Sequence, residues 1–281
     1  MQDAAVTRNK STPIAFIGFG EVGRRLSRDL LANDGVRITA YDVILDDCER
    51  RTELQEIAKT MGVQLAPSME AACGDAEIVI SAVTPDQTEK VARGAANVLA
   101  AGQIFLDVNS ASPATKKRSA SAVEKSGASY VEGAVMAPVL KLGVRVPILA
   151  GGPAAEATAA RLNALGMNLT PAASEHGCAS AIKLCRSIMI KGIEALIVDC
   201  ARASRHWGVE RDVFASLAET FPSIDWPQLA EDMAGRVAKH GIRRAAEMQE
   251  AADMLAEIGL EPSLARAIAG AQQRGARPRR L

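Results

Sequence analysis

The sequence predicts an α/β chain in which a mostly parallel sheet, covered by helices, is followed by an all-helical C-terminal region. In residues 11–176, short apolar runs alternate with amphipathic stretches, which is the order that builds a parallel sheet with helices on both faces. From residue 177 onward only helical patterns remain. With 281 residues and 48% hydrophobic content, the chain can form two cores. We therefore expect domains at 11–176 and 177–273 and a flexible tail at 274–281.

The first strand-like run leads directly into a glycine-rich loop. Residues 14–17 are apolar and are bounded by Pro13 and Gly18, as expected of a buried parallel strand. The loop has the form Gly-x-Gly-x-x-Gly, and we expect it to bind a cofactor through Gly18, Phe19, Gly20, Glu21, Val22 and Gly23. Such glycines allow a tight turn, close approach of the backbone to a pyrophosphate, and close packing of the next helix. The N-terminus of that helix attracts phosphate.

Asp42 supports the same interpretation. It follows the strand-like run 36–41, and it lies nineteen residues (42 − 23) after Gly23. At the end of a second parallel strand, a carboxylate can accept hydrogen bonds from an adenosine ribose. These features predict a Rossmann-type doubly wound sheet with a dinucleotide site; the alternative is a glycine-rich turn beside an ordinary surface aspartate. The carboxylate favours NAD over NADP, because a 2′-phosphate would meet like charge.

The rest of the first region continues the alternation. We expect further strands at 63–65, 76–81, 104–108, 130–133 and 146–150, and helices at 49–61 and 113–125. Another helix should begin at Thr84, as its cap, with Pro85 in the first turn. Ligands of parallel sheets bind beyond the carboxyl ends of the strands. The loops after Ile17, Ile80 and Val108 should therefore converge on one crevice.

The second region begins with a long helical pattern at 179–204. Its length of about 26 residues corresponds to roughly 39 Å. It is apolar on most sides, as expected of a helix buried between two layers or two subunits. Further helices are expected at 209–220, 226–240, 242–258 and 263–271, with Gly241 as a break between the second and third of these.

Lys183 is the candidate acid/base residue. It lies near the start of the long helix, one turn before Ser187 on the same face. Transfer of a hydride from an alcohol carbon requires removal of the hydroxyl proton, and a lysine amine beside the cofactor could accept that proton. The alternative is a structural lysine that reaches solvent or forms an ion pair.

Composition argues against several other classes of protein. Lys+Arg and Asp+Glu balance at 33 each and aromatic residues make up only 3%, which disfavours a nucleic-acid surface. The five cysteines contain no CxxC pair, so we expect them to be buried in a reducing cytoplasm. No apolar run is long enough for a membrane span, and residues 1–12 lack the apolar core of a signal peptide. His176 and His206 lack metal-spaced partners, so no metal site is expected.

Three segments together resemble the β-hydroxyacid dehydrogenase superfamily, which includes 6-phosphogluconate and 3-hydroxyisobutyrate dehydrogenases. They are the glycine-rich loop, the stretch Asp107–Pro113, and the stretch Gly177–Ser187. The resemblance extends from about Thr12 to Ile258. It implies that Lys183 is the catalytic lysine.

The same resemblance implies the nicotinamide side of the site. Ser110 stands where the family has a threonine that contacts the cofactor. Val83 and Thr84, in the loop after the preceding strand, would line the nicotinamide with it.

The departures from the family pattern concentrate on the substrate side. Met136 replaces a serine that holds the substrate carboxylate, and Pro138 has no backbone N–H to donate. Ser187 stands at the position of a substrate-binding asparagine. Arg243 occupies the nearest match to a C-terminal lysine and, with His240, could form a replacement carboxylate clamp. The alternative for that pair is a solvated helix face.

Together these features predict an NAD(P)-dependent dehydrogenase that acts on a small, anionic 3-hydroxyacid or a related carbonyl compound. Two alternatives remain open. One is an imine or amino-acid-type reductase on the same scaffold, although relatives that reduce imines tend to replace the lysine. The other is a nucleotide-binding regulator without turnover, suggested by the altered substrate loop. Family members associate through their helical domains, so we expect a homodimer or a higher homo-oligomer.

Overall fold

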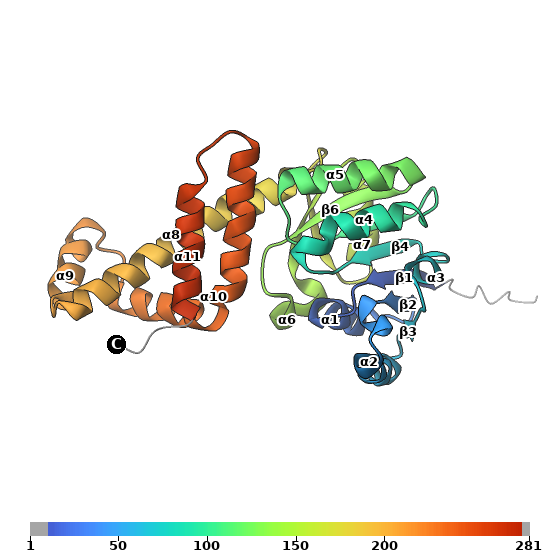
Figure 1. The fold of residues 1–281 in the computed structure, drawn as a ribbon, viewed down its shortest axis with the longest axis horizontal. Helices are drawn as coiled ribbons and strands as arrows, with labels where there is room; N and C mark the ends of the chain where they lie inside the picture. Colours follow the sequence, from blue (N-terminus) through green and yellow to red (C-terminus); the bar gives the residue numbers. More distant parts are fainter. Residues whose placement is uncertain (1–10, 277–281) are drawn as a thin grey trace, which may run out of the picture. The chain divides into compact units, whose positions relative to one another are not determined.

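The computed structural model describes residues 11–276, and the chain forms two compact units, Met1–Ser180 and Ala181–Leu281. The first unit is an eight-stranded sheet with the order β3-β2-β1-β4-β5-β6-β7-β8 (Figure 1). Its strands are β1 Thr12–Ile17, β2 Val36–Tyr41, β3 Gln64–Leu65, β4 Ile78–Ser81, β5 Ile104–Asp107, β6 Ser129–Val135, β7 Pro147–Gly151 and β8 Asn168–Ala173. All neighbouring strands pair in parallel except β6 and β7. The predicted α/β fold class, with an all-helical region after the sheet, is confirmed.

Helices cover both faces of this sheet. They are α1 Glu21–Leu30, α2 Cys48–Met61, α3 Met69–Cys73, α4 Thr88–Ala96, α5 Pro113–Val123, α6 Val139–Leu142 and α7 Ala155–Asn163. Alternate residues of β1 face opposite sides: Ile14 and Phe16 pack with α1, α2 and α7, whereas Ala15 and Ile17 pack with α3, α4 and α5. Figure 1 shows α4 and α5 on one side of the sheet and α1 on the other. Because both faces are buried, the strands read as continuous apolar runs rather than as alternating ones.

The strand ends are aligned at one edge of the sheet. One row of paired residues crosses it there: Tyr41, Ile17, Ser81, Asp107 and Glu132. Gly18 and Asp42 follow this row directly. The predicted convergence of the loops after β1, β4 and β5 at one edge is therefore confirmed.

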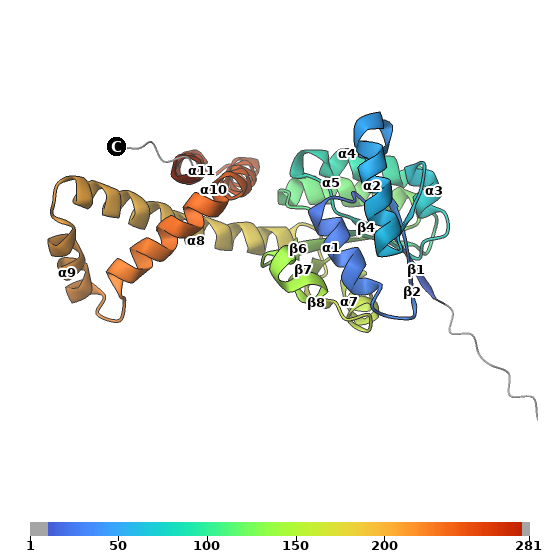
Figure 2. The same ribbon diagram turned by 90° about the horizontal axis from the view of Figure 1, so that it is seen from below.

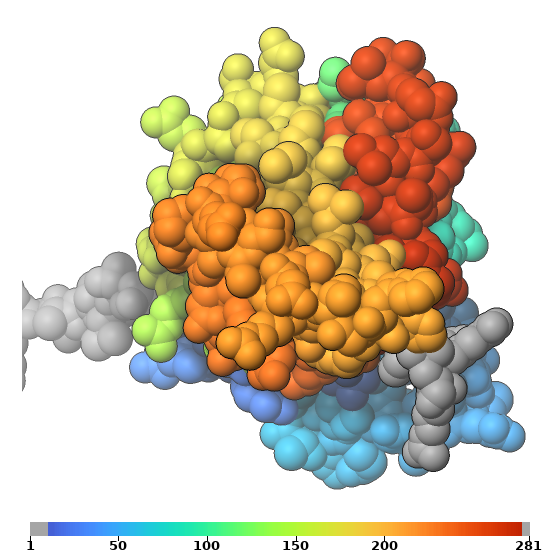
Figure 3. Space-filling model, turned by 90° about the vertical axis from the view of Figure 1, so that its left-hand side faces the viewer, coloured from blue at the N-terminus to red at the C-terminus, as the bar shows by residue number. Residues whose placement is uncertain are grey.

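The second unit is built from helices. They are α8 Cys178–His206, whose first residues belong to the first unit, α9 Glu210–Thr220, α10 Trp226–Glu257 and α11 Ser263–Ala276. Two small cores hold them together. Leu184 of α8 packs with Met248 of α10 and Ile268 of α11, whereas Phe214 of α9 packs with Ile197 of α8. Figure 2 shows α8, α9 and α10 from below, and Figure 3 shows the surface of α9 with the adjoining ends of α8 and α10.

The predicted helix break at Gly241 is wrong. The helix α10 runs through this residue for 32 residues. A Cβ on Gly241 would lie 2.2 Å from the Gln272 carbonyl oxygen and 2.8 Å from the Ala276 Cβ. The glycine therefore serves close packing of α11 against α10. The expected start of the tail is wrong as well, because α11 continues to Ala276; residues 277–281 lie outside the described part.

Other expectations also need correction. The sequence reading missed α7 and β8 and did not anticipate that β7 runs antiparallel to β6. Of the cysteines expected to be buried, only Cys73 is; Cys178 is half-buried, and three are exposed: Cys48, Cys185 and Cys200. Within the described residues, no helix is both long and apolar enough to cross a membrane, and no group of His, Cys, Asp and Glu side chains could hold a metal ion.

Candidate active site

The loop between β1 and α1 contains two positions that require glycine. Gly18 has a φ of +92°, and a Cβ there would lie 2.4 Å from the Ala82 carbonyl oxygen. A Cβ on Gly23 would lie 2.3 Å from the Gly18 carbonyl oxygen. A Cβ on Gly20, in contrast, would meet nothing within 4 Å. The first and third glycines are thus needed by the fold, whereas the second leaves open space above the backbone.

The N-terminus of α1 is open to an anion. Its N-cap is Gly20, which has no side chain to accept hydrogen bonds from the N–H groups of the first turn. Those amides and the positive end of the helix dipole are available to phosphate. Phe19 is fully buried and its carbonyl oxygen accepts the Arg24 Nε–H at 2.9 Å, whereas Glu21 is exposed and Val22 is half-buried.

Asp42 fixes the shape of the same loop. Its Oδ2 accepts the Phe19 N–H at 2.7 Å, and its Oδ1 accepts the Ile44 N–H at 3.0 Å. A carboxylate has about four lone-pair sites, so each oxygen keeps capacity for one more donor, such as a ribose hydroxyl. The open glycine, the uncapped helix and this half-buried carboxylate fit the pyrophosphate and ribose of a dinucleotide.

Asn109 joins the next two loops. Its Oδ1 accepts the Val83 N–H at 2.7 Å, and its Nδ2 donates to the Ser81 Oγ at 2.9 Å. Val83 also lies against the glycine loop, since its Cγ1 would be 2.8 Å from a Cβ on Gly18. The loops after β1, β4 and β5 therefore form one connected surface.

The other two residues expected on the nicotinamide side lie in these loops. Ser110 directly follows Asn109 and is half-buried, whereas Thr84 is exposed. Thr84 occupies the N-cap position directly before Pro85, as expected, but its side chain makes no cap hydrogen bond. Its hydroxyl instead hydrogen-bonds the Asp86 side chain and lowers the pKa of that carboxyl.

A buried ion pair lies directly beneath the β5 loop. The Lys116 Nζ lies 2.9 Å from Asp107 Oδ1 and donates to the Asp107 carbonyl oxygen at 3.0 Å. The Tyr130 hydroxyl donates to Asp107 Oδ2 at 2.7 Å. Burial, together with the Asp107 charge, raises the pKa of Tyr130 well above its usual value. Since Asp107 Oδ1 also accepts the Asn109 N–H at 3.0 Å, the pair holds the loop that carries Asn109.

A second buried acid, Glu132, holds the start of α8. Its Oε1 accepts the Ala179 N–H at 2.8 Å, and its Oε2 accepts the Ser180 hydroxyl at 2.9 Å. An anion at a helix N-terminus is favourable. Gly151 leaves room for this carboxylate, because a Cβ there would lie 2.3 Å from Glu132 Oε1. The helix that carries the half-buried Lys183 thus begins at the carboxyl edge of the sheet.

In the helical unit, Ser187 lies inside a charged cluster rather than at the surface. It is 3% exposed, and its hydroxyl donates to Glu247 Oε1 at 2.6 Å. Lys191 donates to the Ser187 Oγ at 3.0 Å and lies 3.0 Å from Glu247 Oε1. Further along α8, the fully buried Glu194 pairs with Arg244.

The remaining substrate-side candidates do not join this cluster through any described hydrogen bond or ion pair. Met136 is half-buried after β6, and its N–H is used by the Pro147 carbonyl oxygen at 2.9 Å. His240 and Arg243 are exposed on α10. Partial burial and the charge of Arg243 lower the pKa of His240.

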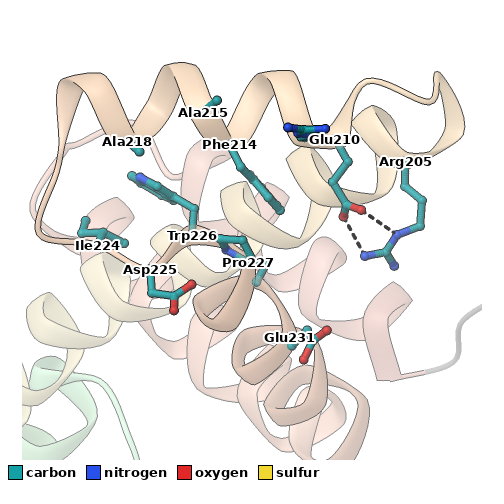
Figure 4. Close-up of a pocket in the computed structure, with 12 residues that line it drawn as sticks. Arg205, Glu210, Phe214, Ala215, Ala218, Ile224, Asp225, Trp226, Pro227 and Glu231 are labelled. Carbon is teal, nitrogen blue, oxygen red and sulfur yellow. Dashed lines mark hydrogen bonds and ion pairs between the residues drawn. The ribbon is translucent and has the colours of Figure 1, made fainter.

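A groove of about 530 Å³ lies elsewhere in the helical unit, between α9 and the adjoining ends of α8 and α10 (Figure 4). Phe214 and Trp226 line it, and Arg205 pairs with Glu210 beside it at 2.6 Å. Arg205 follows Lys183 along α8 by 22 residues (205 − 183), or roughly 33 Å. The groove is therefore separate from the candidate acid/base residue.

Comparison with known proteins agrees with this geometry. Residues 13–174 match the NAD-binding domain of 6-phosphogluconate dehydrogenase, and residues 204–275 match a domain of unknown function, DUF1932. The chain belongs to the β-hydroxyacid dehydrogenase superfamily. As a member of this superfamily, it carries a domain for a nicotinamide dinucleotide.

Three individual proteins to which this chain is similar have known structures or sequences. A conserved hypothetical protein from Sinorhizobium meliloti shares 37% identity with a TM-score of 0.85, over 96% of this chain and 91% of that one. A conserved protein of unknown function, described as similar in structure to 3-hydroxyacid dehydrogenases, shares 33% identity with a TM-score of 0.76, over 94% and 97%. Human mitochondrial 3-hydroxyisobutyrate dehydrogenase is 25% identical over 182 residues, which are 64% of this chain and 53% of the enzyme. The match thus spans about half the length of the human enzyme.

The sequence patterns do not point to four polar residues of the two units: Asn109, Glu132, Lys191 and Glu247. Each acts through a partner distant in sequence; for example, Glu132 and Ala179 are 47 residues apart. A signal existed for Glu132 and Asn109, because a polar residue at the end of an apolar strand is costly to bury without a partner. No comparable local signal marked Glu247, which lies in an ordinary amphipathic helix.

Proposed function

We propose that this protein is an NAD(P)-dependent oxidoreductase that transfers a hydride between a nicotinamide cofactor and a small 3-hydroxyacid or related carbonyl compound, with Lys183 as general acid/base. The observation that carries the proposal is the position of Lys183 in α8. It follows Ser180, which hydrogen-bonds Glu132 at the carboxyl edge of the sheet, by three residues (183 − 180). The open glycine loop lies beyond that same edge.

The chemistry requires one proton acceptor on the protein. When bound, the nicotinamide supplies the hydride acceptor. During oxidation, the alcohol C–H bond breaks and its electron pair leaves as hydride, while the hydroxyl proton moves to the neutral Nζ of Lys183 and a carbonyl forms. In reduction, the Lys183 ammonium returns the proton to the carbonyl oxygen. The backbone around Gly18 and the carboxylate of Asp42 orient the cofactor.

The substrate is small and, in this proposal, anionic. Met136 would give it an apolar contact where the superfamily resemblance implies a serine. Arg243 and His240, both exposed on α10, could hold a carboxylate, since arginine binds carboxylates through two parallel hydrogen bonds. Ser187 is the weakest of the substrate-side candidates, because its hydroxyl proton is donated to Glu247.

The preferred cofactor in this proposal is NAD. A 2′-phosphate beside Asp42 would meet a carboxylate that already orders the glycine loop. Calorimetric titration should give at least tenfold tighter binding of NAD⁺ than of NADP⁺. Asp42→Ala should weaken NAD⁺ more than NADP⁺, whereas Asp46→Ala, which removes an exposed carboxylate from the following turn, should leave both unchanged. Tighter binding of NADP⁺ to the unaltered protein would contradict this assignment.

A second copy of this chain is the expected partner. Four apolar side chains on α8 are exposed at intervals of seven, four and three residues, which places them on one helix face: Ile182 45%, Met189 63%, Ile193 41% and Leu196 74%. A stripe of this kind is typical of a helix that packs against another subunit. Sedimentation should give a dimer or larger assembly, and Leu196→Glu should weaken it. A monomer at high micromolar concentration would refute the proposal.

The activity is tested with a panel of 3-hydroxyacids and NAD⁺, followed by NADH absorbance, with Lys183→Ala as the critical variant. The expected result is turnover that falls at least a hundredfold in Lys183→Ala while NADH affinity is unchanged, since general acid/base catalysis contributes about 10²–10⁴ in rate. Lys141→Ala, which removes an exposed lysine of α6, is the matched control. Activity that survives Lys183→Ala would overturn the assigned role.

Two other results would identify the alternatives. Turnover of cyclic imines or ketone–amine pairs, but not of hydroxyacids, would indicate an imine or amino-acid-type reductase. Tight cofactor binding with no turnover on either panel would indicate a nucleotide-binding regulator. The presence of Lys183 favours an enzyme with a hydroxyl or carbonyl substrate over an imine reductase and over a regulator without turnover.

A further inference from the structure

The charged cluster on α8 and α10 has a feature that the proposed chemistry does not use. Glu247 is a largely buried carboxylate, with 16% of its side chain exposed. It accepts the Ser187 hydroxyl proton at 2.6 Å and lies 3.0 Å from the Lys191 Nζ. The Lys191 Nζ in turn donates to the Ser187 Oγ at 3.0 Å. The carboxylate is therefore held in one orientation from two sides.

Lys183 lies on the same face of α8 as both of these partners. Positions 183, 187 and 191 are four residues apart, so their side chains follow one another along the helix. Burial raises the pKa of Glu247, but the charges of Lys183 and Lys191 and the hydrogen bonds from Ser187 and Lys191 outweigh it and lower that pKa to about 2. Lys183 thus interacts with a carboxylate that stays ionised.

Other charged and polar side chains lie on the three helices α8, α10 and α11. On α8, Glu194 is fully buried and pairs with Arg244 of α10. The helix α11 contributes Gln272, a neutral side chain that donates to the Lys191 carbonyl oxygen at 3.2 Å. Glu250, also on α10, lies one turn after Glu247 and is itself engaged in an interaction.

Neutralising the charge of Lys191 is not the whole role of the Glu247 carboxylate. Burial lowers the pKa of Lys191 and the Glu247 charge opposes that effect, so this pair compensates itself. Lys183 is half-buried and needs no buried counter-ion to remain in place. The charge of Lys183 is the largest of the effects that lower the pKa of Glu247, so the carboxylate must in turn favour the protonated form of Lys183.

We infer that Glu247 is a positioning residue for Lys183: its carboxylate, oriented by Ser187 and Lys191, directs the Lys183 side chain and strengthens its hold on the proton that it exchanges with the substrate. This inference rests on the proposed acid/base role of Lys183. It also gives Ser187 a role inside the protein, because the single hydroxyl proton of that serine goes to Glu247.

The charge on Lys183 can be measured without any turnover. Trace acetylation with acetic anhydride at a series of pH values labels only the neutral amine, and mass spectrometry of the tryptic peptides gives the labelled fraction of Lys183. In Glu247→Gln we expect Lys183 to bind its proton at least tenfold more weakly than in the unaltered protein. Glu231→Gln, which removes an exposed carboxylate earlier on α10, should leave the titration of Lys183 unchanged. An unchanged titration in folded Glu247→Gln would overturn the inference.

A second variant keeps the test valid if Glu247→Gln folds poorly. Removing one partner of a buried ion pair is destabilising, whereas replacing both is often neutral. The double variant Glu247→Gln/Lys191→Met should therefore fold, and in it Lys183 should bind its proton more weakly than in Lys191→Met alone. Lys191→Met alone keeps the carboxylate and removes a competing cation, so Lys183 should hold its proton as tightly as before or more tightly. A weaker hold in Lys191→Met would contradict the inference.

Catalytic measurements separate this inference from the proposed function. If hydroxyacids are oxidised, Lys183 must be neutral to accept the proton, so Glu247→Gln should shift the acidic limb of the kcat–pH profile to lower pH, with NADH affinity unchanged and partial rescue in Glu247→Asp. If no substrate is turned over but the titration of Lys183 shifts as expected, the proposed function fails and the positioning by Glu247 stands. Turnover with an unshifted pH profile and an unshifted titration would refute the positioning alone.

Discussion

The buried ion pair beneath the β5 loop gives the sharpest stability prediction, which is that Lys116→Met strongly destabilises the first unit. The Lys116 and Asp107 side chains are 0% and 1% exposed, and their charged atoms lie 2.9 Å apart. Methionine retains much of the length and volume of the lysine stem, so the substitution removes the charge with little change in packing. What remains is an aspartate that is buried without its cation.

The cost follows from the partners that Asp107 keeps. Removing one member of a buried ion pair costs about 3–5 kcal/mol. Asp107 still accepts the Tyr130 hydroxyl at 2.7 Å and the Asn109 N–H at 3.0 Å, so we expect the lower end of this range, about 3 kcal/mol. For a unit of this size, each kcal/mol lowers the unfolding temperature by roughly 2–4 °C. The expected decrease is therefore about 6–12 °C.

Thermal unfolding followed by circular dichroism is the suitable assay, because both tryptophans, Trp207 and Trp226, lie in the second unit and their emission does not report on the first. Lys117→Met is the matched control, since Lys117 is the next residue on α5 and is exposed. The double variant Lys116→Met/Asp107→Asn should recover part of the loss, because it leaves no buried charge. A Lys116→Met protein within about 1 kcal/mol of the unaltered one would refute the reasoning.

Three further predictions concern other parts of the chain. Gly20→Ala should unfold at an unchanged temperature, since a Cβ there meets nothing within 4 Å, but it should bind NADH at least tenfold more weakly in a fluorescence titration. Gly18→Ala should in addition lose stability, because the φ of Gly18 is +92°. Burial raises the pKa of Cys73 to about 12, so at pH 8 this thiol should react with Ellman's reagent only after unfolding, and rapid labelling of it in the folded protein would contradict the fold. Burial raises the pKa of Glu247, but the charges of the nearby lysines outweigh burial and lower this pKa from 4.5 to about 2. The ionised carboxylate therefore stabilises the fold by an amount on the order of 3 kcal/mol, which is complete above pH 4.5 and is lost as the pH falls toward 2. Urea unfolding of Glu247→Gln should accordingly depend less on pH in that window, and an equal dependence would show that another acid is responsible.

The nucleotide half of the site was predictable because it depends on local backbone geometry. Gly18 needs a positive φ, and Gly23 lies against the Gly18 carbonyl oxygen; both requirements arise within six consecutive residues. Asp42 could be placed because parallel strands end at one edge of a sheet, whatever the rest of the chain does. The rule that glycine and proline interrupt helices and strands holds in this loop, because there too the cause is local backbone geometry.

The same rule failed at Gly241, where the physical cause is remote. Nothing near this residue in the sequence shows that the Gln272 carbonyl oxygen approaches to within 2.2 Å of a Cβ built on it. Glycine in a helix is then a packing device rather than a terminator. The antiparallel strand β7 and the pairing of β8 were likewise set by tertiary contacts that local patterns do not encode.

The substrate half of the site differs because its chemistry depends on which hydrogen-bond donors are already used within the protein. The resemblance implies that positions 136, 138 and 187 hold an anionic substrate, but Met136 uses its N–H on the Pro147 carbonyl oxygen, Pro138 has none, and Ser187 gives its proton to Glu247. All three therefore lack a donor for a carboxylate. The sequence shows that Met136 has no side-chain hydroxyl and Pro138 no N–H, whereas the use of the Met136 N–H and of the Ser187 proton is visible only in the structure. The contact of Ser187 joins residues 60 positions apart. Recognition of a carboxylate by this chain would consequently depend on cations such as Arg243 rather than on the motif positions. For that reason the function of the cofactor domain can be inferred from the motifs that it shares with relatives, whereas the substrate must be found by experiment on this chain.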